Sequence, residues 1–172
     1  ILQNNSCNYI HLNSTTSTMD EAKEYLEKFH SNVVILADEQ KNGKGRRGNM
    51  WISPPGNIYC SIALNNTIPI NEYYLFSMLT AVSVKFTLEN FGTNEIKFKW
   101  PNDIFFKNNK FGGMILETHN SKKNDKYVII GIGINFASSP SIEDYKTTFI
   151  KKFVKINNKL IFLYSFLNNF FF

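Results

Sequence analysis

The stretch IKFKWPNDIFFKNNKFGGMILET, residues 96–118, decides the fold because it contains three short apolar segments joined by polar turns. Aromatic and β-branched residues predict strands over 96–100, 104–107 and 111–118. Pro101 prevents the first two segments from forming one continuous central strand. The stretch therefore predicts a meander of strands that follow one another directly.

The segments around this meander complete an α+β pattern. YVIIGIGI (127–134) predicts the strand that follows it, and VVILA (33–37) and IYCSIAL (58–64) predict buried strands before it. Apolar residues at helical spacing predict a long core helix over 71–91 that Gly92 ends. One long helix beside consecutive strands favours α+β over a doubly wound sheet. The side chains expected to pack in the core are Tyr74, Leu75, Met78, Leu79, Val82, Phe86 and Leu88.

Further helices are expected near both ends. Thr18 and Glu21 have the spacing of a capping box, which predicts a helix over 20–30. A short helix is expected over 141–149, and LIFLYSFLNNFFF (160–172) reads as an apolar helix. Its three final phenylalanines suggest either that the chain is a fragment or that this face packs on another surface.

Composition narrows the class of protein. The chain has 172 residues, 43% of them hydrophobic, which suits one globular domain. A net charge of +5 suits a phosphate-bearing ligand or an acidic partner, and is too small to demand nucleic acid. Cys7 and Cys60 lack metal-ligand spacing and are expected as reduced thiols. No apolar run approaches the roughly 20 residues that span a bilayer.

The loop QKNGKGRRGNMW, residues 40–51, carries four basic residues and three glycines between two predicted strands. Glycine lets backbone N–H groups approach phosphate oxygens, and Lys44, Arg46 and Arg47 add positive charge. The segment is neither a Walker A loop nor a dinucleotide fingerprint. Considered alone, it could hold phosphates, grip a nucleic acid or simply connect the strands.

Three further motifs accompany this loop. KWPND (99–103) bends between two strands and would direct Asn102 and Asp103 to a common point. Glycines inside the apolar strands KFGGMILE (110–117) and GIGIN (131–135) indicate close approach of a ligand or another backbone. An ordinary turn explains KWPND equally well when that motif is considered alone.

Together these motifs resemble the biotin protein ligases, over roughly residues 9–137. That family has, in order, Ser-Thr at a helix start, Gln before a GRGRxG-type loop, Trp, KWPND, Lys before a glycine pair and an ILVE-like strand, and GxGIN. The matching segments here are Ser17-Thr18, Gln40 with GKGRRG and Trp51, Lys99–Asp103, Lys110 with Gly112-Gly113 and Met114–Glu117, and Gly131–Asn135. Lys44 stands where the family commonly has Arg, which keeps the charge but loses bidentate geometry.

The resemblance implies a fold like the catalytic core of class II aminoacyl-tRNA synthetases, a mixed β-sheet backed by helices with the ligand on one sheet face. It implies two substrates, biotin and Mg-ATP, which give biotinyl-5'-AMP and pyrophosphate. The ε-amine of a specific lysine on a biotin carboxyl carrier domain then attacks the mixed anhydride. The expected partner is thus the carrier domain of a biotin-dependent carboxylase, with no nucleic acid and no membrane.

The resemblance also implies roles for individual residues. Lys110 and Arg46 are expected to be catalytic, and Asp103 is expected to contact Mg²⁺. Residues expected to bind biotin are Ser17, Thr18, Gln40, Gly43, Lys44, Gly113 and Gly131. Residues expected to bind ATP or the adenylate are Lys44, Arg46, Arg47, Trp51, Asn102, Lys110 and Asn135.

The expected organisation is a single catalytic domain, 1–172, with the motifs within 9–137 and a helical tail over 138–172. The small C-terminal β-barrel that these ligases usually carry is not evident in that tail, and a cytoplasmic location is expected, with an organelle and a homodimer left open. Three alternatives remain: a lipoate ligase or octanoyltransferase of the same fold, a nucleic-acid-binding module that uses the basic loop, and a non-catalytic biotin-binding relic.

Overall fold

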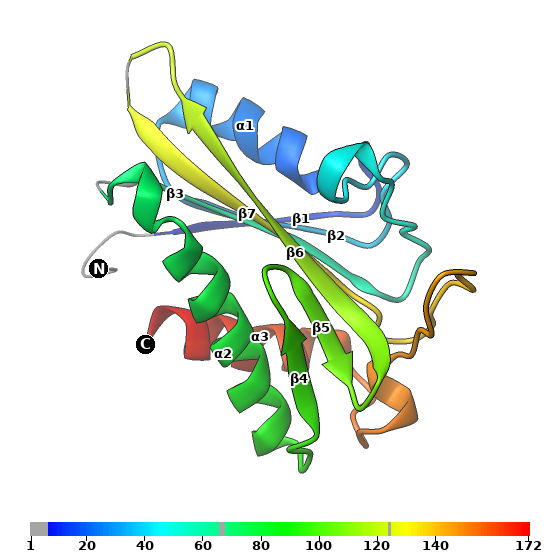
Figure 1. The fold of residues 1–172 in the computed structure, drawn as a ribbon. Helices are drawn as coiled ribbons and strands as arrows, with labels where there is room; N and C mark the ends of the chain where they lie inside the picture. The colour runs from blue at the N-terminus through cyan, green and yellow to red at the C-terminus, as the bar shows by residue number, and fades with distance from the viewer. Residues whose placement is uncertain (1–6, 66–67, 124) are drawn as a thin grey trace.

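Seven strands form one sheet in the order β1-β2-β3-β7-β6-β5-β4 in the computed structural model, which describes residues 7–65, 68–123 and 125–172 (Figure 1). The strands are β1 (Asn8–Leu12), β2 (Val33–Ala37), β3 (Ile58–Asn65), β4 (Ile96–Lys99), β5 (Asp103–Phe106), β6 (Asn109–Asn120) and β7 (Lys126–Ile134). The α-helices are α1 (Thr18–Phe29), α2 (Tyr74–Asn90) and α3 (Lys159–Phe171). Short 3-10 helices are η1 (Arg46–Gly48), η2 (Ile70–Glu72) and η3 (Ile150–Lys152).

The sheet is mixed, as the resemblance implied. Strands β1 and β2 are parallel, and every other neighbouring pair is antiparallel. The predicted meander is confirmed, because β4, β5, β6 and β7 pair in chain order. Strand β1 was missed by sequence reasoning, since NYIHL is short, half polar and lies at the edge of the sheet.

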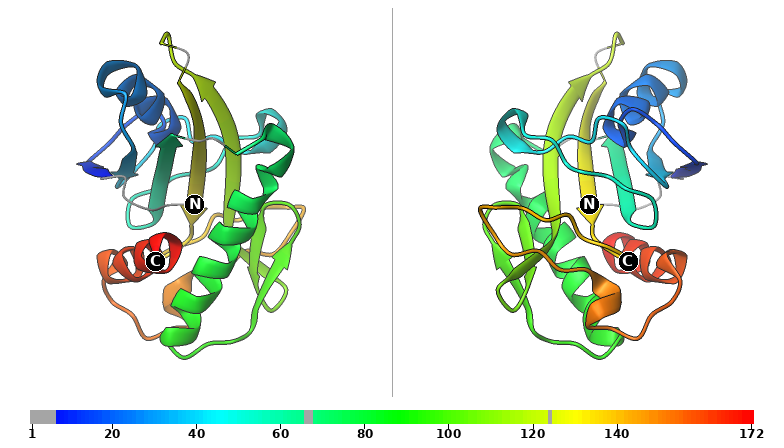
Figure 2. Two further views of the ribbon diagram at one scale, coloured as in Figure 1. Left: turned by 90° about the vertical axis from the view of Figure 1, so that its left-hand side faces the viewer. Right: turned by 90° about the vertical axis from the view of Figure 1, so that its right-hand side faces the viewer.

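Helices cover both faces of the sheet (Figure 2). Side chains alternate along β2, so that Val33 and Ile35 join a cluster with α1, whereas Val34 and Leu36 join the larger cluster with α2 and α3. Strand β2 is therefore buried on both sides, which explains its unbroken apolar run. None of the helices in the described part of the chain is long and apolar enough to cross a membrane.

The predicted core face of α2 was largely wrong. Leu88 is buried as expected, but Tyr74, Met78, Val82 and Phe86 are 43–51% exposed. The buried face instead carries small hydroxyl residues, namely Ser77, Thr80, Ser83 and Thr87, beside Phe76, Val84 and Leu88.

The reason for this orientation is the packing of α3 on α2. The Thr80 and Thr87 hydroxyls each donate to a carbonyl one turn earlier at 2.7 Å, so they can be buried without an unsatisfied polar group. Ser83 Oγ donates to the Asn169 carbonyl of α3, and Asn169 Nδ2 donates to Thr87 Oγ1. Apolar residues occur almost all around α2, so periodicity alone could not select this face.

The tail was predicted correctly only in part. Helix α3 is confirmed, and Asn158 caps it by accepting from the Leu160 N–H at 2.8 Å. The helix expected over 141–149 is wrong, because this segment is irregular and Thr147 pairs with Lys110 as an isolated parallel bridge. Backbone pairing to β6 thus replaces the internal hydrogen bonds of a helix.

The capping box was also wrong. Helix α1 begins at Thr18, and its N-cap Ser17 makes no side-chain capping bond. The Thr18 hydroxyl bonds to Gln40 instead, while the carboxylate of Glu21 accepts from Thr15 Oγ1 at 2.5 Å. Residues outside the helix have therefore taken both capping partners.

We expect Phe166→Ala to destabilise the fold by about 3–5 kcal/mol, because Phe166 is 1% exposed in the core between α3 and the sheet. Tyr164→Ala on the same helix is the matched control, since Tyr164 is 69% exposed and its loss should change little. Urea denaturation measures both. Equal effects would mean that α3 does not dock by the Phe166 face.

An ion pair ties the start of α3 to the end of β2. Lys159 Nζ lies 2.6 Å from Asp38 Oδ1, and His11 Nε2 lies 3.0 Å from the same oxygen. The Lys159 bond foremost, and then the His11 bond, lowers the pKa of Asp38, against the opposing effect of partial burial. A carboxylate with a lowered pKa stabilises the fold above its unfolded pKa of about 4, and this contribution is lost as the pH falls through the folded pKa.

We therefore expect Lys159→Met to lower the free energy of unfolding by about 1 kcal/mol at pH 7, and by progressively less below about pH 4. Lys155→Met, which changes an exposed lysine, should have little effect at either pH. Denaturation curves at several pH values measure this difference. A pH-independent effect of Lys159→Met would contradict the assignment.

Candidate active site

Glycines on two neighbouring strands, β6 and β7, form the floor of a cavity. On β7, Tyr127 and Ile129 pack with α1, and the next two positions of the same face are Gly131 and Gly133. Gly113 of β6 lies directly opposite Gly133. The sheet face is therefore hollow just beyond the N-terminus of α1.

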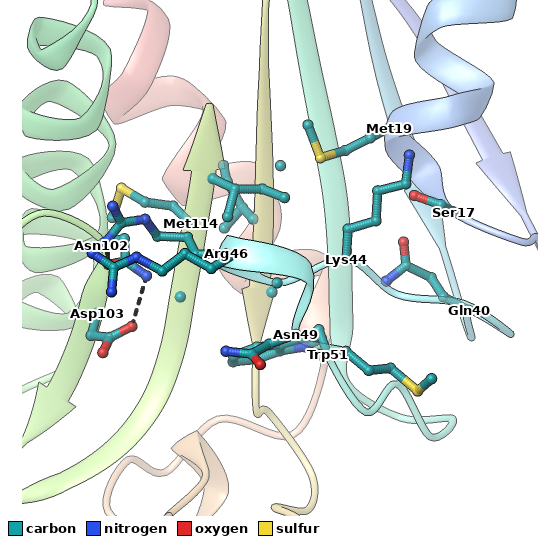
Figure 3. Close-up of a pocket in the computed structure, with 18 of the residues that line it drawn as sticks. Ser17, Met19, Gln40, Lys44, Arg46, Asn49, Trp51, Asn102, Asp103 and Met114 are labelled. Atoms are coloured by element: carbon teal, nitrogen blue, oxygen red, sulfur yellow. Dashed lines mark hydrogen bonds between the residues drawn. The ribbon is translucent and has the colours of Figure 1, made fainter. Parts of the chain in front are cut away.

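Two side chains from elsewhere occupy part of this space. A Cβ on Gly131 would lie 2.6 Å from Met19 Sδ, and a Cβ on Gly133 would lie 2.5 Å from the Trp51 indole. Neither contact is sterically allowed, so both glycines are needed for these side chains to lie where they do. The remaining cavity has a volume of about 370 Å³ (Figure 3).

One end of the cavity is lined by hydroxyl and amide groups. Gln40 Oε1 accepts from the Thr18 N–H at 2.9 Å and from Thr18 Oγ1 at 3.1 Å, while its Nε2 donates to Ser53 Oγ at 3.0 Å. Ser61 Oγ also donates to Thr18 Oγ1, at 2.8 Å. Ser17 Oγ is buried in the cavity wall without a partner in the described structure. Since buried hydroxyls are normally hydrogen-bonded, Ser17 is free to bond a ligand.

The basic loop closes over the other part of the cavity. Gly45 donates to the Asn49 carbonyl and Trp51 to the Gly43 carbonyl, each at 2.8 Å, so the loop forms a tight hairpin. Gly48 at its tip has φ +80°, a conformation that favours glycine.

Two side chains fasten this hairpin to the walls of the cavity. Lys44 Nζ bonds Asp20 of α1, and Arg46 Nη1 donates to Asn102 Oδ1 of the β4–β5 turn at 2.9 Å. Figure 3 shows the Lys44 side chain extending toward Ser17 and Met19, and Arg46 lying beside Asn102. The loop therefore bridges the two sides of the cavity, and it places two cations at the rim.

Lys110 lies in the same cavity, beside the Asn102–Asp103 turn. Its Nζ lies 2.8 Å from Asp103 Oδ1, which also accepts from Asn102 Nδ2 at 3.0 Å. The ammonium lies 5.5 Å from the Trp51 ring centroid and 5.1 Å from that of Tyr145. A lysine whose side chain is only 13% exposed is thereby fixed in position.

The irregular segment after β7 fixes the backbone of Lys110 as well. The Lys110 N–H donates to the Lys146 carbonyl and the Lys110 carbonyl accepts from Thr148, each at 2.9 Å. These bonds explain why residues 141–149 are extended rather than helical. They also bring Tyr145 to the cavity.

Most of the residues expected from the sequence come together here. All of them line the cavity except Gly43 and Asn135. Gly43 lies tightly packed against the Trp51 carbonyl and Ser53, and Asn135 is buried with its Nδ2 donating to the Thr148 carbonyl at 3.2 Å. Asn135 borders a smaller hollow beside Trp51 and Tyr145.

Sequence reasoning missed Met19, Gly133 and Tyr145, which line the cavity, and Asp20, which pairs with Lys44. Gly133 had a signal, because it belongs to the same GIGIN motif as Gly131. No local sequence pattern pointed to Asp20 or Tyr145, because their contacts to Lys44 and Lys110 join distant parts of the chain.

Asp103 does not by itself form a resident magnesium site. Its Oδ1 already accepts from Lys110 and Asn102, and the described residues contain no group of three His, Cys, Asp or Glu side chains able to hold a metal. Magnesium is usually bound by one or two carboxylates together with substrate phosphates. The residues present thus fit a metal that enters with a phosphate ligand.

A cavity with hydroxyl and amide groups beside the Lys44–Asp20 pair at one end, and with Arg46 and Lys110 near the Asn102–Asp103 turn at the other, suits a ligand with a polar head and an anionic tail. The chain matches the biotin/lipoate A/B protein ligase family over residues 9–135. It therefore belongs to this family.

Individual relatives agree with this membership. The chain is 34% identical over 110 residues to the bifunctional ligase/repressor BirA of Bacillus subtilis, covering 63% of this chain and 34% of the relative. It is 31% identical over 131 residues to the biotin--[acetyl-CoA-carboxylase] ligase of Paracoccus denitrificans, covering 73% and 53%. The chain thus spans about a third to a half of the length of these curated relatives.

A solved structure resembles almost the whole chain. The biotin protein ligase of Leishmania major in complex with biotinyl-5-AMP superimposes with a TM-score of 0.84 at 25% identity. The match covers 95% of this chain and 73% of that protein. The sheet and its covering helices are therefore those of a biotin protein ligase structure.

We expect Gly133→Ala to destabilise the protein by about 1–3 kcal/mol, because its new methyl group would overlap the Trp51 indole. In a Trp51→Ala background the same substitution should cost little, since the overlapping ring is gone. Urea denaturation of the four proteins in this cycle measures the coupling. Equal costs in both backgrounds would show that Trp51 does not lie on Gly133.

Proposed function

We propose that the chain is a biotin protein ligase, which activates biotin with Mg-ATP and transfers it to a lysine of a biotin carboxyl carrier domain. The observation that carries this proposal is the fixed position of Lys110 beside Asp103, in one cavity with a cluster of hydroxyl and amide groups and the basic loop. A reaction between a carboxylate and a phosphate needs positive charge where negative charge develops.

The polar end suits the ureido ring of biotin. Ser17 Oγ has no protein partner, and Thr18 and Gln40 hold each other in a fixed orientation beside it. The ring would bond these groups and lie over the glycine floor, with its valeryl chain directed toward Lys110. Gly113 and Gly131 are proposed to give the ring and chain the room that side chains would fill.

The cationic end suits the nucleotide. Arg46 and Arg47 line the cavity near Asn102 of the facing turn, and Lys44 extends from the same loop to Asp20 at the start of α1. Their proposed role is to hold the phosphates, with Trp51 and Asn135 toward the nucleoside. Magnesium would enter as Mg-ATP, neutralise phosphate charge, and lie near Asp103.

The first step joins a biotin carboxylate oxygen to the α-phosphorus of ATP and breaks the bond to the β-phosphate, so that pyrophosphate leaves. Lys110 and Arg46 offset the charge on the phosphate oxygens while this occurs. In the second step the neutral acceptor amine attacks the acyl carbon. The bond to the phosphate oxygen breaks, AMP leaves, and the amine loses a proton.

Lipoate ligation is the nearest alternative, because the family includes both kinds of ligase. Biotin is favoured by the curated relatives, which are named for biotin ligation or for BirA, and by the hydroxyl and amide groups of Ser17, Thr18 and Gln40, which can bond a ureido ring. A nucleic-acid module is disfavoured, since Lys44 and Arg46 are directed to Asp20 and Asn102 rather than to open solvent.

Mass spectrometry tests the proposed function directly. The chain, biotin, Mg-ATP and a carrier domain should yield a carrier whose mass has increased by one biotinyl group. Replacing biotin by lipoate should yield none. If the carrier were modified by lipoate but not by biotin, the chain would be a lipoate ligase. If neither compound modified the carrier, the chain would be a non-catalytic biotin-binding relic.

We expect Lys110→Met to lower the rate of biotinyl-AMP formation by about 10²- to 10³-fold, because it removes the fixed positive charge at the reacting centre. Binding of biotin alone, measured by calorimetry, should be largely kept. Lys107→Met is the matched control, since Lys107 pairs with Glu95 on the exposed side of the β4–β5 hairpin and should leave the rate unchanged. Normal adenylation by Lys110→Met would contradict the mechanism.

A further inference from the structure

A large apolar surface lies beside the cavity and is covered by no described part of the chain. It consists of Tyr74, Met78, Val82 and Phe86 on α2, with Phe98 and Trp100 at the end of β4, and is termed the α2 apolar surface. These side chains are 39–63% exposed. Together they present on the order of 600 Å² of apolar area, the upper range for the largest patch on a monomer.

These residues form one surface. The four helical residues follow one another at intervals of four, which places them in a row along α2. Met78, Val82, Phe98 and Trp100 line a common hollow of about 200 Å³, and the rings of Tyr74 and Trp100 meet edge to face at 6.5 Å between centroids. Helix α2 and the β4–β5 hairpin lie side by side in two views (Figures 1 and 2).

The surface is continuous with the mouth of the active-site cavity. The hollow under Val82 and Trp100 also touches Asn102, Asp103 and Met114, which line the cavity itself. A groove of about 500 Å³ connects Tyr74 and Trp100 to Arg46 and Arg47 of the basic loop. A protein that occupied the α2 apolar surface would therefore stand next to the opening through which an acceptor amine must enter.

The charges at the rim indicate the chemistry of the occupant. Lys99 lines the hollow and Arg47 lines the groove, and neither has a carboxylate within ion-pair distance among the described residues. The carboxylate in the groove, that of Glu117, already pairs with Lys23 at 2.5 Å. The rim is thus positive, which disfavours a second copy, because a two-fold pairing would bring like charges together.

We propose that the α2 apolar surface docks the acceptor protein, through an apolar face flanked by carboxylates. This inference rests on the proposed function, which requires a folded protein to present a lysine at the cavity mouth. The apolar row would provide most of the affinity, and Lys99 would orient the partner. Docking there leaves the cavity free for biotin and ATP.

Steady-state kinetics of two half-reactions test this proposal. Val82→Glu places a charge in the middle of the row, and Ile161→Glu on α3 is the matched control, since both are β-branched residues exposed on a helix, at 43% and 55%. Adenylate formation without a carrier is measured by trapping biotinyl-AMP with hydroxylamine. Transfer is measured with the carrier domain as the varied substrate.

We expect Val82→Glu to form the biotinyl hydroxamate at the wild-type rate, and to raise the KM for the carrier domain about tenfold or more. Ile161→Glu should change neither. Lys99→Glu, a second variant at an exposed position, should raise the same KM and weaken its dependence on salt. Circular dichroism checks that each variant is folded.

The possible failures are distinguishable. Absence of hydroxamate with the wild-type chain overturns the proposed function and the docking surface together. Normal hydroxamate formation with an unchanged KM in both Val82→Glu and Lys99→Glu overturns the docking surface alone. A wild-type dimer in sedimentation that Val82→Glu dissociates would assign the surface to a second copy and overturn the proposal.

Discussion

The whole site depends on one steric constraint, the absence of Cβ atoms at three positions of β6 and β7. Gly113, Gly131 and Gly133 share the sheet face that packs against α1 and carry nothing that could continue its core. Met19 and Trp51 approach the backbone there at distances that any larger residue would prevent. At the start of α1, Thr18 and Gln40 bond each other beside this hollow, and Ser17 Oγ has no protein partner there.

The remaining parts of the site are held to this floor by contacts between distant segments. The basic loop is fastened to α1 by Lys44 and to the β4–β5 turn by Arg46. Lys110 is fixed by Asp103 and, through its backbone, by the segment after β7. Catalytic groups need rigid neighbours, because small displacements weaken their interaction with a transition state. The sheet, the loop and the tail together provide that rigidity.

Elements whose backbone conformation is restricted by their own residues could be predicted from the sequence. The strands around KWPND and GIGIN were recognised, because proline and glycine restrict the backbone directly, and most residues expected at the site do line one cavity. Strand β1 was missed, because a short half-polar edge strand depends on its neighbour rather than on its own residues.

Features that depend on tertiary packing could not be predicted in this way. Helix α2 turns its hydroxyl residues inward and leaves Met78 and Phe86 exposed, since the approach of α3 decides which face is buried. The segment 141–149 pairs with Lys110 rather than forming a helix, and Tyr145 reaches the site only as a result. Both predictions failed for the same reason. The local sequence allows several conformations of similar stability, and tertiary packing selects one of them.

A crystal structure of the chain with biotin and a non-hydrolysable ATP analogue tests this arrangement of the site. We expect the ureido ring against Ser17, Thr18 and Gln40, the valeryl carboxylate beside Lys110, and the phosphates between Lys110 and the basic loop. Biotin bound outside the glycine floor, or phosphates bound away from Lys44 and Arg46, would contradict it.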